Sequence, residues 1–356
     1  MENHRLIIKE IETADLSICE KSESFLQSYM WGEFKSRFGW EARAFLINWE
    51  GRGSTPLLAI SRKVIFGFSF VYIPWGPELP VGFPEADRGN ALCELAKKLK
   101  IFFKSKPFFI RFDPGWYNEE GAFFSKEEAA SFLSAGLKCA AQVQPPDTVL
   151  VDLKQPAEKI LEKMKSKWRY NISLAQKKNV IVKSAGANEL ETFYALLKET
   201  AQRDGILVHS FDYYKTLFEI CEKDCNELTL RLYTAIHEGE TIASIVTLFR
   251  GRYATYLYGA TSDSKRSLMP SYALQWKAIR DAKEAGCQFY DFFGIPPDDN
   301  PNHPMAGLYR FKTGFGGKII HRPGSWDFPY KPFFYGLFNF AENLRKKLRD
   351  RKKRKK

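Results

Sequence analysis

The pattern of apolar and polar positions repeats one order of elements twice along the chain. In the first half, three extended runs, a helical stretch and a further strand follow one another over residues 42–50, 56–64, 68–76, 90–103 and 107–114. In the second half, the same order occupies residues 231–238, 241–250, 253–262, 271–286 and 288–295. Hairpins that lead to a strand, a helix and an adjacent strand form a mixed sheet with helices on its faces. The pattern therefore predicts an α/β protein built from two similar units.

The turn-forming sequence QPPD, residues 144–147, lies between the two units. A length of 356 residues also favours two domains over one. We expect a first domain over residues 1–147, a second domain over residues 148–330 and a C-terminal tail over residues 331–356.

A basic helix is predicted between the repeated units, over residues 157–178. Its apolar side chains recur every three or four positions and form one stripe, made of Ile160, Met164, Trp168, Ile172 and Ala175. Most of its cationic side chains lie off that stripe, namely Lys163, Lys165, Lys167, Arg169, Lys177 and Lys178. The pattern fits a solvated helix face and a contact with a phosphate backbone equally well.

The net charge of +12 is concentrated at the C-terminus. Ten basic residues and one acidic residue between Arg345 and Lys356 account for +9, which leaves +3 for the rest of the chain. An apolar and largely aromatic run precedes them, made of Phe333, Phe334, Leu337, Phe338, Phe340 and Leu344. This order is typical of an interfacial helix with a polybasic anchor, so we expect contact with an anionic membrane surface. Contact with tRNA and a disordered solubilising tail are the alternatives.

Neither the start of the chain nor any internal segment has the pattern of a targeting or membrane-spanning sequence. The first residues, MENHRLIIKEIETADLSIC, lack a basic flank, a continuous apolar stretch and a small-residue cleavage site. No segment approaches the roughly 18 uninterrupted apolar residues that a spanning helix needs. We therefore expect a cytoplasmic protein, peripheral at the inner face of the cell membrane if the tail binds lipid.

The six cysteines and five histidines are scattered without the spacing of a metal site. Cys221 and Cys225 would share a helix face, but no histidine or second cysteine pair lies near them in sequence. The sequence also contains neither a nucleophile elbow nor a His-Glu metal motif. We expect free thiols and no bound metal.

Several motifs together resemble one family. In the second half these are YLYGATS, YDFFGI and GLYRFKTGFGG, at residues 256–262, 290–295 and 307–317. Earlier segments agree in order, namely QSYMWGEFK, FIRFDP, KSKWRYNI and RDGILVHSFDYY, at residues 27–35, 109–114, 165–172 and 203–214. The succession resembles the Fem family (FemABX-like) of peptidoglycan-bridge aminoacyltransferases, and its compact members without a helical-hairpin insertion. The resemblance implies two tandem acetyltransferase-like (GNAT-type) domains.

The resemblance also implies a reaction. An amine of a peptidoglycan stem peptide attacks the ester carbonyl of an aminoacyl-tRNA, and no ATP, metal or organic cofactor is needed because that ester is already activated. Lys312, in YRFKTGF, matches a family lysine whose ammonium would stabilise the oxyanion. Asp113, in FIRFDP, matches a family aspartate that would accept or orient the proton of the amine. Its alternative role is to cap the turn before Pro114.

The peptidoglycan precursor, UDP-linked or lipid-linked, carries a diphosphate. The resemblance assigns its binding to Lys35, Tyr213 and Tyr258, and places Phe311, beside Lys312, with the substrate-binding residues. Compact relatives carry a phosphate-binding arginine where this chain has His209, which removes a permanent cation. We expect Arg203 to compensate, or His209 to be an ordinary loop residue. The expected assembly is a monomer.

Two other functions stay open. An acyl-CoA-dependent N-acyltransferase of the same fold would need a glycine-rich pyrophosphate loop before the helix at residue 271, but that loop reads SDSKRSLMPSY. A non-enzymatic RNA-binding protein would use the basic helix and the tail. Asp291, in YDFFGI, is expected to be structural in each case.

Overall fold

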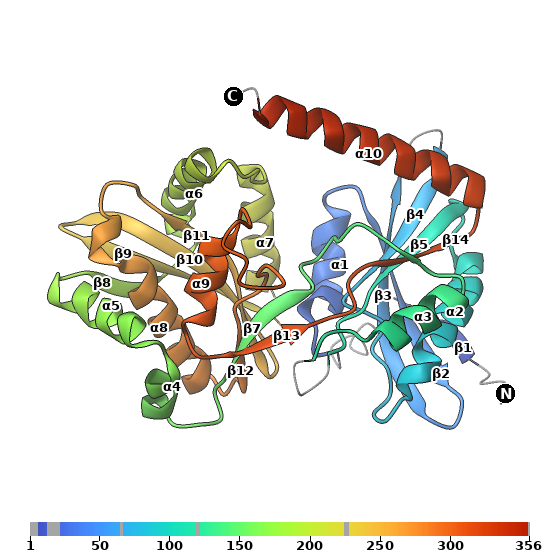
Figure 1. Ribbon diagram of the computed structural model, residues 1–356, viewed down its shortest axis with the longest axis horizontal. Helices are drawn as coiled ribbons and strands as arrows, with labels where there is room; N and C mark the ends of the chain where they lie inside the picture. Colours follow the sequence, from blue (N-terminus) through green and yellow to red (C-terminus); the bar gives the residue numbers. More distant parts are fainter. Residues whose placement is uncertain (1–5, 13–21, 65–66, 118–121, 224–227, 355–356) are drawn as a thin grey trace.

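The computed structural model describes residues 6–12, 22–64, 67–117, 122–223 and 228–354. Two mixed sheets, each of seven strands, lie side by side with helices around them (Figure 1). The repeated order of elements predicted from the sequence is confirmed, and so is the α/β fold class.

The first sheet has the strand order β1-β2-β3-β4-β5-β14-β6. Its strands are Leu6–Glu10 (β1), Glu41–Trp49 (β2), Gly53–Lys63 (β3), Ser69–Pro74 (β4), Pro107–Asp113 (β5), Lys138–Cys139 (β6) and Trp326–Pro329 (β14). Among its described strands, β4 and β5 pair in parallel and the other pairs are antiparallel. The helices of this unit are Tyr29–Ser36 (α1), Arg88–Leu99 (α2) and Lys126–Ser134 (α3). The apolar stripe of α2 packs on one face of the sheet, and α1 covers the other.

The second sheet has the order β13-β7-β12-β11-β10-β9-β8. Its strands are Asp147–Asp152 (β7), Ile181–Ala185 (β8), Thr229–His237 (β9), Glu240–Arg250 (β10), Tyr253–Thr261 (β11), Phe289–Asp291 (β12) and Lys318–His321 (β13). Its helices are Ala157–Lys163 (α4), Ser166–Lys177 (α5), Leu190–Asp204 (α6), Phe211–Lys223 (α7), Pro270–Glu284 (α8) and Ala306–Thr313 (α9). The helices α4, α5 and α8 bury one face, while α6 and α7 bury the other.

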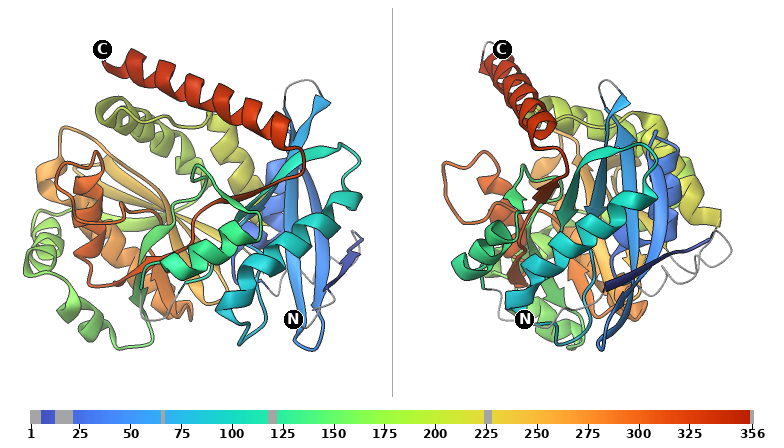
Figure 2. Two further views of the ribbon diagram at one scale, coloured as in Figure 1. Left: turned by 45° about the vertical axis from the view of Figure 1, so that its right-hand side comes forward. Right: turned by 90° about the vertical axis from the view of Figure 1, so that its right-hand side faces the viewer.

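One apolar core joins the two units. Phe34 of α1 lies 4.7 Å, between ring centroids, from Tyr213 of α7, and the same cluster reaches Tyr72 of β4 and Val246 of β10. The helices α1 and α7 therefore lie against each other between the two sheets (Figure 2), and α6 lies next to α7 on the second sheet. The units are packed together rather than tethered by a linker.

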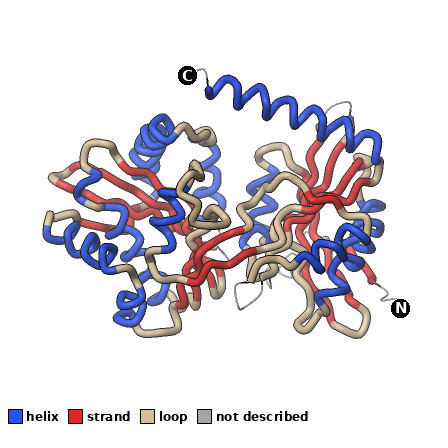
Figure 3. The backbone as a smooth tube through the Cα atoms, in the orientation of Figure 1, coloured by secondary structure: helices blue, strands red, loops and turns tan. Residues whose placement is uncertain are grey.

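The chain crosses between the units twice, and the two crossings lie side by side (Figure 3). The backbone of Arg322 donates to Pro146 at 3.1 Å, and that of Ala140 donates to Ser325 at 2.9 Å. The second crossing carries β14 back into the first sheet, between β5 and β6. Residues 326–329 thus belong to the first sheet, although the sequence pattern grouped them with the second unit.

The predicted single helix over residues 157–178 is wrong, because it is broken into α4 and α5. Met164 and Lys165 adopt extended backbone there, with ψ of 149° and 142°. The cause is tertiary: the Lys165 amide donates to the Gly314 carbonyl at 2.9 Å, after the end of α9. A Cβ atom on Gly314 would collide with the Trp168 ring, so only glycine permits this contact. The predicted apolar stripe is nevertheless buried, with Trp168 partly so.

The C-terminal segment forms one long helix, Pro332–Arg354 (α10), that projects from the first unit (Figure 1). Tyr335 and Phe338 pack against Phe108 and Phe109 of β5. Several other apolar side chains of α10 face away from the protein, and Phe333 is 73% exposed. Within the described part of the chain, no helix is both long and apolar enough to span a bilayer.

Candidate active site

The second sheet opens where two parallel strands separate. Only three residue pairs join β11 to β12, from Tyr253 with Phe289 to Thr255 with Asp291. Beyond Asp291 the backbone turns through Phe293 and Gly294, with φ of 46° and 64°. The helix α9 carries Lys312 to this turn.

The side chain of Lys312 is buried, with 5% of its surface exposed. Its ammonium donates to the carbonyls of Phe292 at 2.6 Å and Gly294 at 2.8 Å, and also to that of Phe293. All three donors of the ammonium are therefore used by one turn of backbone. Burial lowers the pKa of Lys312 to about 7, and the carboxylate of Asp291 opposes this shift.

Asp291 closes the end of β12. Its carboxylate accepts from the Thr148 hydroxyl and, at 2.8 Å, from the Phe293 amide, and it lies 3.6 Å from the Arg322 guanidinium. These bonds fix the start of the turn that Lys312 caps. The interactions fit the structural role expected for Asp291.

A second group of candidate residues meets at the junction of α1, α7 and β11. The Nζ atom of Lys35 lies 5.7 Å from the ring centroid of Tyr213 and 5.6 Å from that of Trp40. Burial, together with Arg62, lowers the pKa of Lys35 to about 8. Burial also raises the pKa of Tyr213 to about 12, and Tyr258 is its hydrogen-bond partner. The structure thus brings Lys35, Tyr213 and Tyr258 together.

His209 joins this group by stacking on Tyr213, with ring centroids 3.8 Å apart and planes 14° apart. Burial and the nearby charge of Lys35 lower the pKa of His209. The lowered pKa disfavours the imidazolium, so His209 does not replace the permanent cation of an arginine. Tyr214, which sequence reasoning missed, lies 5.1 Å from Tyr258 between ring centroids. The paired tyrosines of FDYY were the only signal for it.

Two predicted substrate-binding residues lie elsewhere. Arg203 donates to Asp263 at 2.6 Å, to the Thr261 carbonyl at 3.0 Å and to its neighbour Asp204. Its guanidinium is occupied by these groups, and within the described chain no hydrogen bond or ring contact joins it to His209. Phe311 packs on the core of the second unit, with its ring centroid 5.2 Å from that of Tyr272.

Asp113 lies at the end of β5 in the first unit and is 2% exposed. One oxygen of its carboxylate accepts from the Tyr72 hydroxyl at 2.8 Å and from the Gln144 amide at 3.0 Å. Burial raises the pKa of Asp113, and these hydrogen bonds oppose the rise. The bond to Gln144 ties the first crossing between the units to the first sheet.

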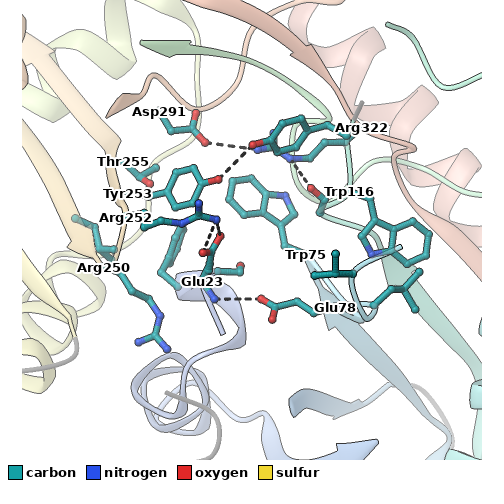
Figure 4. A pocket seen from close by; sticks show the side chains of 17 residues that line it. Glu23, Trp75, Glu78, Trp116, Arg250, Arg252, Tyr253, Thr255, Asp291 and Arg322 are labelled. Atoms are coloured by element: carbon teal, nitrogen blue, oxygen red, sulfur yellow. Dashed lines mark hydrogen bonds and ion pairs between the residues drawn. The ribbon is translucent and has the colours of Figure 1, made fainter. Parts of the chain in front are cut away.

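A cavity of about 400 Å³ lies between the units (Figure 4). Its walls include Trp75, Trp116 and Arg250, and two other lining residues, Asp291 and Arg322, approach each other at its edge. None of the substrate-binding or catalytic residues expected from the sequence lines it. Among the described residues, no cluster of His, Cys, Asp and Glu side chains suits a metal ion.

Comparison with solved structures shows which fold class the protein belongs to. Over 92% of this chain and 99% of its own, a tandem GNAT protein from the clavulanic acid biosynthesis pathway superposes with a TM-score of 0.54 at 12% identity. A crystal structure of FemX superposes with a TM-score of 0.78 at 20% identity, over 93% of this chain and 99% of its own. The protein therefore has a tandem GNAT-like fold, as expected.

The sequence matches the FemAB family over residues 10–231 and 231–343, and the chain belongs to that family. A lipid II:glycine glycyltransferase of Staphylococcus aureus (strain USA300) is 23% identical over 380 aligned positions, which cover 88% of this chain and 89% of that protein. The resemblance drawn from the motifs is thereby confirmed. The protein is a FemABX-family aminoacyltransferase.

Proposed function

We propose that the protein transfers an amino acid from aminoacyl-tRNA to the stem-peptide amine of a peptidoglycan precursor. Family membership and a relative named as a lipid II:glycine glycyltransferase support this choice of substrates. The observation that carries it is the buried ammonium of Lys312 at the opening of the second sheet. A buried cation is costly, and its retention there fits a role in a reaction that develops negative charge.

In the proposed reaction, the neutral amine attacks the ester carbonyl, a C–N bond forms and the C–O bond to the tRNA ribose breaks. The amine loses a proton and the leaving ribose oxygen gains one. Lys312 holds the carbonyls of residues 292–294 in one arrangement. To donate to the oxyanion itself, its ammonium must exchange one of these bonds for the new acceptor.

For Asp113 we propose a positioning role. Its carboxylate accepts from the Gln144 amide and so fixes the crossing segment to the end of β5. For the acceptor, we propose that Lys35 contributes the cation and that Tyr213 and Tyr258 contribute the hydroxyl groups. These three side chains form one cluster between the units.

Incubation of the purified protein with charged tRNAs and precursor, UDP-linked and lipid-linked, tests the reaction. The expected product is a precursor lengthened by an amino acid, detected by mass spectrometry and absent with deacylated tRNA. A lack of transfer across a broad panel would reject the proposal. Acylation that instead requires acyl-CoA, with CoA binding seen by calorimetry, would make the protein an N-acyltransferase.

The acceptor cluster is tested separately. Lys35→Met is expected to weaken acceptor binding about tenfold, because it removes a charge-assisted contact with the diphosphate. The matched control is Lys97→Met, which replaces a lysine on the exposed side of α2. His209→Arg should strengthen binding if the missing cation matters, and calorimetry with the UDP-linked precursor measures all three variants. Unchanged affinity in Lys35→Met would remove this lysine from the acceptor site.

A further inference from the structure

The cavity between the units is built by segments far apart in the sequence. Trp75 and Trp116 come from the segments after β4 and β5, while Thr255 lies on β11 and Arg322 on the second crossing. Its volume of about 400 Å³ is within the range of small-ligand sites. Nothing in the proposed reaction uses it.

Arg322 is the feature of this cavity that needs explanation. It is 8% exposed, and its guanidinium carbon lies 4.3 Å from the ring centroid of Trp75. Its Nε atom donates to the Gly115 carbonyl at 3.3 Å, and Nη2 lies 3.6 Å from Asp291. The Nη1 atom is buried without a hydrogen-bond partner in the described structure. A buried donor left unpaired is unfavourable, so an acceptor is expected to complete it.

The charges around the cavity limit what that acceptor can be. On the wall opposite Arg322 (Figure 4), Glu23 pairs with Arg252 at 2.6 Å, and Glu78 accepts from the Glu23 amide at 3.2 Å. Arg250 and Arg252 line the cavity too, but a diphosphate would bring several negative charges close to Glu23, Glu78 and Asp291. A ligand with one carboxylate and, a few bonds away, an ammonium group would match Arg322 on one wall and the carboxylates on the other. Aromatic side chains between them suit a small organic ligand.

We propose that this cavity binds the carboxylate of an α-amino acid or a short peptide, with Nη1 of Arg322 donating to it. The guanidinium is held in place by Trp75 and Gly115, so a planar carboxylate meets a pre-oriented donor. The ammonium of the same ligand faces Glu23 and Glu78. This site is separate from Lys35 and Lys312, and its test needs neither tRNA nor transfer activity.

Calorimetry on the full chain with the dipeptide Ala-Ala tests the site. Saturable binding is expected, with at least tenfold weaker binding of the C-terminal amide, because the amide removes the carboxylate charge. N-acetyl-Ala-Ala, which lacks the ammonium, should bind more weakly than Ala-Ala but more tightly than the amide. Equal affinity of dipeptide and amide, or no saturation up to about 10 mM, would overturn the proposal.

Two variants locate the binding. Arg322→Gln is expected to lose at least tenfold in dipeptide affinity, whereas Arg37→Gln, at an exposed arginine outside the cavity, should retain it within about twofold. Near-ultraviolet circular dichroism checks that Arg322→Gln is folded; if it is not, the amide comparison on the natural chain decides. Equal loss in both variants would contradict a carboxylate site at Arg322. Competition with the complete precursor then distinguishes a free amino acid from the peptide end of that substrate.

A second inference rests on α10. Its apolar side chains Phe333, Leu337, Phe340, Leu344 and Leu348 recur every three or four residues and are all largely exposed. They form one stripe opposite the face that Tyr335 and Phe338 use to pack on β5. The sequence places ten basic residues at the far end of the same helix and beyond.

We infer that α10 docks on an anionic membrane surface through this stripe. The apolar stripe inserts at the interface while the basic end meets the lipid headgroups, which is the pattern of an interfacial helix. The packed face leaves the stripe free to bind without unfolding the first unit. Charge complementarity favours anionic over zwitterionic lipid.

Flotation with vesicles containing phosphatidylglycerol, compared with pure phosphatidylcholine, tests this inference. The triple variant Phe333→Gln, Leu337→Gln, Phe340→Gln is expected to lose at least tenfold in binding to the anionic vesicles. The matched control replaces three exposed apolar residues elsewhere, Ile101, Ile181 and Leu207, by Gln. Equal binding to both lipids, or unchanged vesicle binding by the triple variant, would overturn the inference. Loss of tRNA affinity instead, in Arg345→Gln with Lys347→Gln, would assign the helix to RNA.

Discussion

The two units end their parallel strand pair in different ways. In the first, β4 and β5 stay paired through the last residue of each strand, Pro74 with Asp113. In the second, pairing stops at Thr255 with Asp291, and β11 continues to Thr261 alongside β10. An aspartate ends the strand in both units. In the described structure, both units thus have this strand and its final carboxylate, but β11 and β12 separate before the end of β11.

The groups at the end of the parallel strand pair differ in charge between the two units. The carboxylate of Asp113 is held by a tyrosine hydroxyl and a backbone amide. In the second unit the carboxylate is followed by a turn whose carbonyls surround the ammonium of Lys312. The end of the first strand pair thus anchors the connection between the units, while the end of the second holds a buried ammonium.

The largest effect on transfer is expected at Lys312, where β11 and β12 separate in the second unit. Lys312→Met should lower the rate of transfer about 100- to 1,000-fold, because it removes the buried cation and releases the turn at residues 292–294. Acceptor affinity should change only a few fold. Single-turnover kinetics separate the two quantities, and Lys318→Met, at an exposed lysine nearby in sequence, is the control. A loss confined to acceptor affinity would place Lys312 outside the reaction.

The second prediction concerns pH. Since the pKa of Lys312 is lowered to about 7, turnover should fall by about tenfold per pH unit above it if the ammonium is required. Between about pH 7 and 10.5 the unfolded chain holds a proton that the folded state has lost. The free energy of unfolding should therefore rise with pH across this window through this group. Lys312→Met should abolish that rise in denaturant titrations.

The two aspartates offer a matched pair. Asp291 favours the ammonium of Lys312, so Asp291→Asn should move the alkaline fall in turnover to lower pH. Asp113→Asn should leave the position of that fall unchanged. pH–rate profiles of the two variants measure the difference. An equal displacement in both would mean that the two ends share one electrostatic environment.

The smallest effect on transfer is expected at Asp113, where β4 and β5 end in the first unit. Asp113→Asn keeps an acceptor for Tyr72 and Gln144, so transfer should stay within about threefold. Because burial raises the pKa of Asp113, its charged form is disfavoured in the folded state above the ordinary carboxyl pKa. The variant should then be no less stable than the natural chain at pH 7, as thermal denaturation would show. A hundredfold loss of transfer would instead make Asp113 the proton acceptor.

The sequence was sufficient for features that depend on local pattern. The repeated strands, the helix α8 and the buried stripe over residues 160–175 all follow from periodicity. The break after α4 does not, because a bond to Gly314, far along the chain, causes it. The joining of Lys35, Tyr213 and Tyr258 was foreseen through family resemblance and not through spacing. No sequence pattern indicated the cavity at Arg322, because Trp75, Thr255 and Arg322 are far apart in the sequence and come together only in the folded chain.

The return of β14 has a consequence during synthesis. The first sheet lacks its sixth strand until residues 326–329 leave the ribosome, and β6 has β14 as its partner within the described chain. The buried carboxylate of Asp327 also pairs with Arg111 of β5 at 2.7 Å. Until then β5 is an open edge and Arg111 lacks its carboxylate partner, which favours aggregation of the nascent chain. A chain that stops short of β14 therefore leaves the sheet of its first unit incomplete.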